Sequence, residues 1–395
     1  MALLSSADTA PAAVTPPPGH PRFPLIDGLR AIAAISILVT HASFITNASQ
    51  LAFYGKFTAR LEVGVAIFFV ISGFLLYRPF VSSRVDGARR PGYVEYGKRR
   101  VLRIVPAYWL ALTVLSLYPG LPSMWSDHSW AYYLFGQIYV SEWFLGGLGQ
   151  TWSLAVEASW YLLLPFLAML ALRLPGRDRT GKLRSEWALV AALAAFGIGF
   201  RAWAFETQGG GSVLLSTLPS TLAWFAFGMA IAVASVSLHQ RAREPAAVSI
   251  LGRFPLAAWI AAALMFWFVS TQLNLPVGFQ APGRLIEAIS AHVLYGLIGV
   301  ALLLPAVFTG AGGGIPRRIL GNRVLAWLGL ISYGIFLWHY PINQRMALGR
   351  AHDLWGDYQM LGVTLSTLAI TVVCAAGSYY ALERPLLRLK YRRRR

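Results

Sequence analysis

The sequence predicts an all-α, polytopic membrane protein with about ten transmembrane helices and with both termini in the cytoplasm. Composition, long apolar stretches and the positions of the basic residues support this prediction. Of 395 residues, 56% are hydrophobic and only 13% are charged, and the mean hydropathy is +0.55. A soluble domain carries about 25% charged residues, so this chain lacks the charge to cover a water-exposed surface. Its apolar stretches are continuous, which argues against the alternating strands of a membrane β-barrel.

Ten apolar stretches are long enough to cross a bilayer as helices. They are residues 28–48, 61–80, 101–118, 151–173, 187–205, 212–236, 255–273, 287–308, 324–341 and 359–382. The shorter aromatic stretch 130–145 is expected to form an interfacial or re-entrant helix, because it is too short to span. We divide the chain into a disordered Ala/Pro-rich tail (1–22), a ten-helix membrane domain (23–386) and a basic cytoplasmic tail (387–395).

The basic residues test the number of spans. The chain has 34 Lys and Arg against 16 Asp and Glu, a net charge of +18. With ten spans and a cytoplasmic N-terminus, 28 of the 34 fall on the cytoplasmic side, five on the outer side and one within a span. Membrane proteins concentrate Lys and Arg on the cytoplasmic side. The charge excess therefore indicates topology, and we expect no nucleic-acid partner.

The first span carries two polar residues, Arg30 and His41, on one helix face. Their separation of eleven positions returns to nearly the same direction after three turns and covers roughly 16 Å of helix. Arg30 is expected at the cytoplasmic end and His41 near the middle of the bilayer. This pair suits a ligand with an anionic head and a long neutral arm, such as coenzyme A. A snorkelling arginine and a histidine bonded to a neighbouring helix remain the alternative.

The next two spans contribute small and basic residues. Ser72 and Gly73 permit close helix approach, so helix packing is the simplest explanation for them. Arg100 and Arg103 share a face at the start of the third span, where Pro106 is expected to produce a kink. Guanidinium groups at this position could hold the phosphates of a nucleotide-type cofactor. Anchoring at the cytoplasmic surface explains any single one of them equally well.

Polar residues also occur in the fourth and ninth spans. Ser153 and Glu157 are i, i+4 neighbours, and Glu157 lies too deep for a charge that caps the helix start. Ionisable residues within spans usually serve function. His339 closes the ninth span at its expected outer end, where contact with water is the simplest explanation. The single cysteine, Cys374, makes no intrachain disulfide or cysteine-based zinc site, and no metal is expected.

Taken together, these motifs resemble acyltransferase family 3, the membrane-bound acyltransferases that include polysaccharide O-acetylases, Nod-factor acetylases and macrolide acyltransferases. The matching segments are residues 27–30 with His41, 68–74, 99–109, 151–157, 332–333 with 339–341, and 383–385. They occur in family order and cover nearly the whole chain. Trp160 is a small departure, since the family commonly carries another aromatic residue there. The additional hydrolase-like domain of some members is expected to be absent.

The resemblance implies transfer of an acyl group, most simply acetyl, from cytoplasmic acyl-CoA to a hydroxyl of a carbohydrate or related acceptor. The acceptor is expected at the outer side of a bacterial inner or plasma membrane. Arg30, Arg100, Arg103 and Ser72 are assigned to the donor, with acetyl-CoA as the expected acyl-CoA. His41 is expected to act as general base or to take the acyl group itself.

The remaining assignments concern the acceptor. Glu157 is assigned as catalytic, orienting His41 or the acceptor, and Trp152, Ser153 and His339 as acceptor-binding. A proton-coupled transporter of a polar solute is the main alternative, because such proteins also carry ionisable residues at mid-membrane. Transporters commonly contain internal repeats, and this chain has none that we detect. A glycosyltransferase that uses lipid-linked sugars and a non-catalytic sensor are further alternatives.

Overall fold

The computed structural model describes residues 23–238, 254–278, 280–308, 314–348 and 354–389. Secondary structure in these ranges is helical, with no β-strand, which confirms the all-α prediction. The long helices are α1 (Leu25–Ile45), α4 (Val63–Asp86), α5 (Tyr93–Leu115), α7 (Trp152–Arg173), α8 (Arg179–Gln208), α9 (Leu218–Leu238), α11 (Pro255–Thr271), α12 (Leu285–Val307), α15 (Ser332–Leu348) and α17 (Gln359–Ser378).

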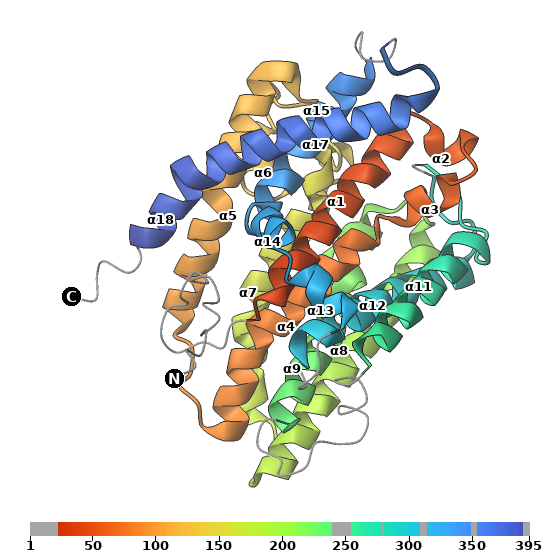
Figure 1. Cartoon of the computed structure of the whole chain (residues 1–395). Helices are drawn as coiled ribbons and strands as arrows, with labels where there is room; N and C mark the ends of the chain where they lie inside the picture. The colour runs from red at the N-terminus through yellow and green to blue at the C-terminus, as the bar shows by residue number, and fades with distance from the viewer. Residues whose placement is uncertain (1–22, 239–253, 279, 309–313, 349–353, 390–395) are drawn as a thin grey trace, which may run out of the picture.

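Short helices connect and extend the long ones. The α-helical pieces are α2 (Ala48–Leu51), α3 (Gly55–Arg60), α6 (Ser129–Tyr133), α13 (Ile315–Leu320), α14 (Arg323–Leu330) and α18 (Arg384–Leu389). Single turns of 3-10 or π type cover Ser116–Gly120, Gln137–Tyr139, Ser141–Trp143, Gly149–Thr151, Val213–Ser216, Gly356–Tyr358 and Tyr379–Glu383. Figure 1 shows α1 inside the bundle, with α17 and α18 crossing over one side.

Each of the ten predicted spans corresponds to helix, with two departures from a simple span. Within the described ranges, eight helical stretches are long and apolar enough to cross a membrane. The predicted span 324–341 is instead two helices, α14 and α15, which meet at an angle of 73°. The predicted span 255–273 is the shorter apolar helix α11, of 17 residues. The structure therefore supports a multi-pass membrane protein that contains one sharply bent helix pair, α14 and α15.

Several predicted boundaries differ from the observed ones. Helix α5 begins at Tyr93, so Pro106 lies inside the helix and not at its start. The stretch 130–145 does not cross the bundle as a helix, but neither is it the single helix expected. It breaks after α6, because Phe135 adopts the left-handed conformation (φ 61°), which a continuing helix excludes. Residues 1–22 and 390–395 of the predicted tails lie outside the described residues, whereas 387–389 belong to α18.

Close backbone contact joins α4 to α9. A side chain at Gly73 would meet the carbonyl oxygen of Phe225 at 2.1 Å, and one at Gly228 would meet that of Val70 at 2.0 Å. Glycine at both positions therefore lets the two helices approach more closely than larger residues allow. The ring of Phe225 stacks on Trp160 from α7, with centroids 4.6 Å apart. These contacts fix α4, α7 and α9 as one unit beside the cavity described below.

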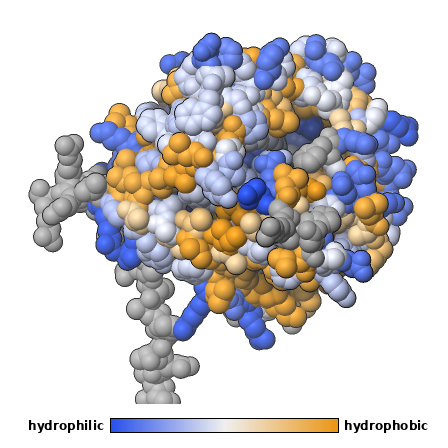
Figure 2. Space-filling view, turned by 90° about the horizontal axis from the view of Figure 1, so that it is seen from above, coloured by the Kyte–Doolittle hydropathy of each residue, from blue (hydrophilic) through white to orange (hydrophobic). Residues whose placement is uncertain are grey.

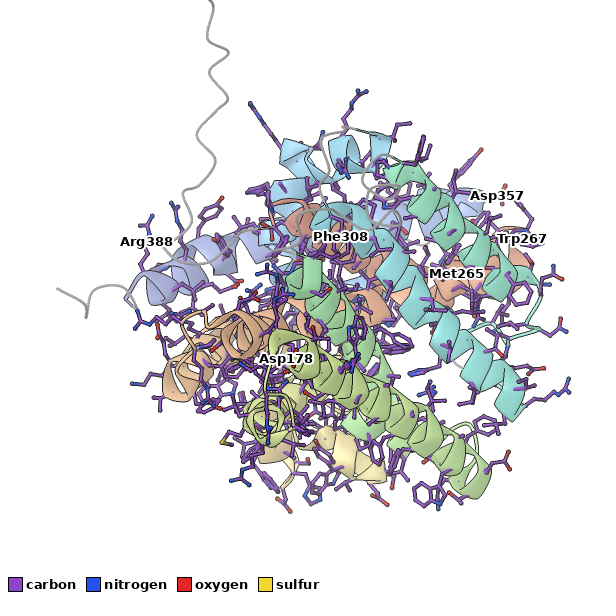
Figure 3. The ribbon with its side chains drawn as sticks, turned by 90° about the horizontal axis from the view of Figure 1, so that it is seen from below. Asp178, Met265, Trp267, Phe308, Asp357 and Arg388 are labelled. Atoms are coloured by element: carbon purple, nitrogen blue, oxygen red, sulfur yellow. The ribbon has the colours of Figure 1, made fainter. Side chains whose placement is uncertain are left out.

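Large hydrophobic side chains remain on the outside of the bundle. Leu162 and Phe166 of α7 are 73% and 64% exposed, and Val373 of α17 is 72% exposed. Trp267 lies at the periphery on α11 (Figure 3). Figure 2 shows hydrophobic residues at the surface between hydrophilic patches. Such a surface would be unstable in water but is compatible with contact with lipid.

Candidate active site

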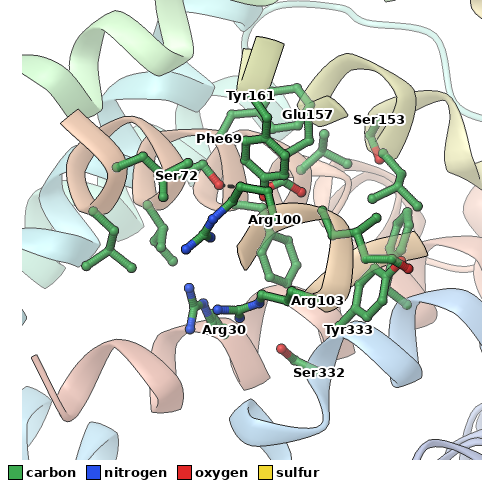
Figure 4. A pocket seen from close by; sticks show the side chains of 18 of the residues that line it. Arg30, Phe69, Ser72, Arg100, Arg103, Ser153, Glu157, Tyr161, Ser332 and Tyr333 are labelled. Carbon is green, nitrogen blue, oxygen red and sulfur yellow. Dashed lines mark hydrogen bonds between the residues drawn. The ribbon is translucent and has the colours of Figure 1, made fainter. Parts of the chain in front are cut away.

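A cavity inside the bundle collects most of the polar residues that the sequence singled out (Figure 4). Its wall combines residues of α1, α4, α5, α7 and α15. The polar side chains are those of Arg30, Ser72, Arg100, Arg103, Ser153, Glu157, Tyr161, Ser332 and Tyr333. The cavity volume is about 170 Å³, below the roughly 300–1,000 Å³ of pockets that bury a whole ligand. It is therefore large enough for only part of a molecule such as coenzyme A.

Three arginines form one end of this cavity. The guanidinium groups of Arg30, Arg100 and Arg103 point toward one another in Figure 4. Arg30 donates to Asp27 one turn before it, at 3.2 Å. Arg100 and Arg103 form no ion pair with any described residue, and the Nε of Arg100 is buried without a hydrogen-bond partner. Such a group of cations favours an anion, since one buried negative group would relieve their mutual repulsion.

A hydrogen-bonded cluster lies beside these arginines on the cavity wall. Ser72 on α4 donates to Oε1 of Glu157 at 2.6 Å. The hydroxyl of Tyr161, one turn after Glu157 on α7, donates to the same oxygen. Arg100 lies over the ring of Tyr161, with its guanidinium carbon 5.7 Å from the ring centroid. The carboxylate thus fixes two hydroxyl groups and supplies the single negative side chain among the residues that line the cavity.

Beyond the other end of the cavity, two histidines from distant parts of the chain meet. Nδ1 of His41 lies 2.9 Å from Nε2 of His339, and their rings are nearly parallel, with centroids 5.1 Å apart. Ile37, one helical turn before His41, lines the cavity. Phe336, one turn before His339, lines it as well. The histidine pair therefore lies on the same faces of α1 and α15, one turn and roughly 6 Å beyond these two residues, although neither histidine lines the cavity itself.

The structure brings most of the predicted site residues together. Arg30, Ser72, Arg100, Arg103, Ser153 and Glu157 all line the cavity. Trp152 does not; it packs against the apolar core. Glu157 contacts Ser72 and Tyr161, whereas the expected contact with His41 is not formed.

The expectation that His339 lies near water is wrong, because this residue is 0% exposed. Helix α15 continues to Leu348, beyond the predicted end of the span at residue 341, and therefore places His339 inside the bundle. Helix packing was the simplest explanation for Ser72 and Gly73, and the structure confirms it for Gly73, which contacts α9. Ser72 faces the cavity instead, where it donates to Glu157.

Three polar residues of the cavity are absent from the sequence-based assignment: Tyr161, Ser332 and Tyr333. Tyr161 could have been found from its spacing, since it lies four residues after Glu157 and so on the same helix face. Tyr333 donates to the carbonyl oxygen of Ile104, at 2.8 Å, and joins α15 to α5. That contact links residues 229 positions apart, and no local pattern reveals it.

Comparison with known proteins agrees with this arrangement. The acyltransferase domain family matches residues 23–382 of the chain. A Bacillus subtilis protein provisionally named a peptidoglycan O-acetyltransferase is 24% identical over 93% of this chain and 55% of its own length. A Staphylococcus aureus protein provisionally named an O-acetyltransferase is 23% identical over 92% of this chain and 57% of its own length. Nodulation protein 10 of Rhizobium leguminosarum is 26% identical over 92% of this chain and 93% of its own length.

The chain spans a little more than half the length of the Bacillus and Staphylococcus relatives. No solved structure matches it. The family match covers nearly all of the described residues, including every residue of the cavity and both histidines. It confirms the resemblance predicted from the motifs: this chain belongs to the acyltransferase domain family, acyltransferase family 3.

Proposed function

We propose that this chain is a membrane-embedded O-acyltransferase that uses cytoplasmic acyl-CoA, most simply acetyl-CoA, as its donor. The acceptor is a hydroxyl of a carbohydrate or related molecule at the outer side of the membrane. Membership in the acyltransferase domain family supports the reaction class. The names of the relatives, two O-acetyltransferases among them, support transfer to oxygen.

The observation that carries the choice of donor is the group of three arginines at one end of the cavity. Coenzyme A carries a diphosphate at the end of a long, flexible arm. Guanidinium groups bind phosphate oxygens bidentately. The excess of Lys and Arg predicts that this end of α1 is cytoplasmic, the side on which acyl-CoA is found. The small cavity volume leaves the adenosine part of the donor outside.

The pantetheine arm would then follow the face of α1 from Arg30 past Ile37 toward His41. The wall along this path is mainly apolar and includes Ile37, Val65, Phe68 and Phe336. An apolar path suits an uncharged arm with few hydrogen-bonding groups. The thioester carbonyl would end near the histidine pair, where the donor and the acceptor approach from opposite sides.

His41 can act in the reaction either as a general base or as a nucleophile. As general base, its ring accepts the proton of the acceptor hydroxyl while that oxygen attacks the thioester carbonyl. The C–S bond then breaks, and the imidazolium returns the proton to the departing thiolate, giving an ester and free coenzyme A. As nucleophile, the ring takes the acyl group first while its own N–H proton passes to the departing thiolate; the acceptor hydroxyl then takes the acyl group from the ring and returns a proton to it.

The remaining residues hold the site together. Ser72 belongs to the donor end, and Glu157 partly balances the arginine charge while it orients the hydroxyls of Ser72 and Tyr161. Ser153 lies on the cavity wall and remains our candidate for contact with the acceptor. We assign Trp152 to the acceptor only because it belongs to the family motif of residues 151–157.

Mass spectrometry of surface glycans and lipids tests this proposal. Cells that lack the chain would be complemented with the wild type, with His41→Ala or with Cys374→Ala as a control outside the cavity. We expect a mass increment of one acyl group that requires His41 and is unchanged in Cys374→Ala. Wild-type acylation in His41→Ala would overturn the proposal. Solute counterflow in vesicles without consumption of acyl-CoA would favour the transporter instead.

A further inference from the structure

The contact between His41 and His339 depends on which nitrogen of each ring carries hydrogen. An imidazole nitrogen donates when it carries hydrogen and accepts when it does not. The 2.9 Å contact between Nδ1 of His41 and Nε2 of His339 therefore needs hydrogen on one of the two nitrogens. The surroundings of each ring decide which nitrogen carries it.

The second nitrogen of His339 fixes the answer for that ring. Nδ1 of His339 lies 2.8 Å from the carbonyl oxygen of Phe336 and 3.2 Å from that of Ile335. A carbonyl oxygen only accepts, so Nδ1 must carry hydrogen to bond to it. His339 is 0% exposed and contacts no carboxylate among the described residues. Because a buried ring with no counter-ion is less costly when neutral, its Nε2 holds a lone pair.

We propose that His339 is a positioning residue that holds His41 in the tautomer with hydrogen on Nδ1 and a lone pair on Nε2. The inference rests on the proposed function, because it assigns the reacting nitrogen of His41. Nδ1 of His41 donates to His339, which leaves Nε2 as the basic atom. In the described part of the chain, Nε2 of His41 has no hydrogen-bond partner, and the side chain is partly exposed. This nitrogen is free to accept a proton or an acyl group.

Two hydrogen bonds tie the helix that carries His339 to its neighbours, one to the turn Gly149–Thr151 and one to α1. Pro341 has no N–H, so the carbonyl of Leu337, four residues earlier, loses its partner within the helix. Gln150 supplies a replacement and donates to this carbonyl at 3.0 Å. On the next turn, the side-chain amide of Asn343 donates to the carbonyl oxygen of Leu38 on α1, at 3.1 Å. The histidine contact is thus bracketed by two cross-links, as expected for a residue whose orientation matters.

The tautomer can be measured without any turnover. The full chain would be labelled with ¹⁵N-histidine in lipid bilayers, and the signal of His41 assigned by its loss in His41→Ala. At a pH where the ring is neutral, we expect a protonated Nδ1 in the wild type and in His339→Gln, whose amide oxygen can still accept. In His339→Leu we expect a mixture of both tautomers. A protonated Nε2 in the wild type would overturn the inference even if the protein proved to be an acyltransferase.

Kinetics test the consequence for catalysis. For His339→Leu we expect kcat to fall by about 10- to 100-fold, while KM for acyl-CoA changes less than about twofold, since the arginines are untouched. His339→Gln should retain most of the wild-type kcat. Tyr340→Phe is the matched control, because it keeps the ring that packs edge-on against His41 with centroids 4.8 Å apart. Wild-type kcat in His339→Leu would refute the positioning role, whereas absence of acyl transfer in every form, with the expected tautomers, would refute only the proposed function.

Discussion

Ser72 and Glu157 are 85 residues apart in the chain, and the serine hydroxyl donates to Oε1 of the glutamate at 2.6 Å inside the cavity. Tyr161 donates to the same oxygen. Oε2 of Glu157 accepts no hydrogen bond from the described residues, so the two hydroxyls hold only one of the two carboxylate oxygens. A substitution that keeps an accepting oxygen can therefore remove the charge of Glu157 while its hydrogen bonds remain.

Glu157→Gln should separate binding from turnover. An amide oxygen can still accept from Ser72 and Tyr161, so the cavity keeps its shape while one negative charge is lost. Because like charges repel, we expect coenzyme A to bind a few-fold more tightly beside the three arginines. The kcat of acyl transfer should fall if Glu157 acts in the reaction. Calorimetric titration of the purified variant with coenzyme A measures the first effect; weaker binding than in the wild type would contradict the expected charge balance.

Neutralising the arginines should act mainly on the donor. Single changes of Arg30, Arg100 or Arg103 to Gln each remove charge-assisted hydrogen bonds worth about 1.5–3 kcal/mol. We expect KM for acyl-CoA to rise by about 10- to 100-fold, with a smaller change in kcat. Arg388→Gln serves as the control, since this residue is exposed on α18 (Figure 3) and does not line the cavity. Equal effects of all four changes would show that general surface charge, not the cavity, attracts the donor.

The buried ion pair between Arg84 and Glu186 should govern stability. Its side chains are 6% and 1% exposed, and the nitrogen and oxygen lie 2.9 Å apart. Arg84→Met leaves Glu186 buried without its cation, which costs about 3–5 kcal/mol. We expect a clear fall in the Tm of the detergent-solubilised protein, and partial recovery in the double variant Arg84→Met/Glu186→Met. A single variant as stable as the wild type would show that water reaches the carboxylate.

Gly228→Ala should loosen the contact between α9 and α4. The added methyl group would lie 2.0 Å from the carbonyl oxygen of Val70, so the helices must separate. We expect a lower Tm and reduced activity, because α4 carries Ser72 into the cavity. Gly199→Ala is the matched control in α8: nothing lies within 4 Å of its new methyl group, and replacing a helical glycine stabilises by about 0.5–1 kcal/mol. If both changes have the same effect on Tm, close packing is not the cause.

Hydropathy predicted where helices would form, because burial in lipid requires long apolar stretches whatever the fold. It could not predict the break between α14 and α15, since the apolar pattern continues through Leu330 and Ile331 without interruption. The break accompanies a close approach in which Gly329 packs on the backbone of Asp27. That contact joins segments distant in sequence and leaves no local signal.

The site was predictable to the extent that its residues share a helix face. Arg30 and His41 are found this way, as are Ser153 and Glu157. The contact of His41 with His339 links positions 298 residues apart, so the sequence alone placed His339 near water and missed its connection to the first helix. Tertiary packing supplied what helical spacing could not.

The break before α15 also has an electrostatic consequence. Ser332 is the first residue of α15 and lies on the cavity wall (Figure 4), so this helix starts inside the bundle, beside the cavity. The first N–H groups of a helix have no partner within it, and the aligned peptide dipoles give that end a partial positive charge. This contribution has no pKa and cannot be titrated away. An anion held by the arginines would therefore meet an additional positive potential that is built into the backbone.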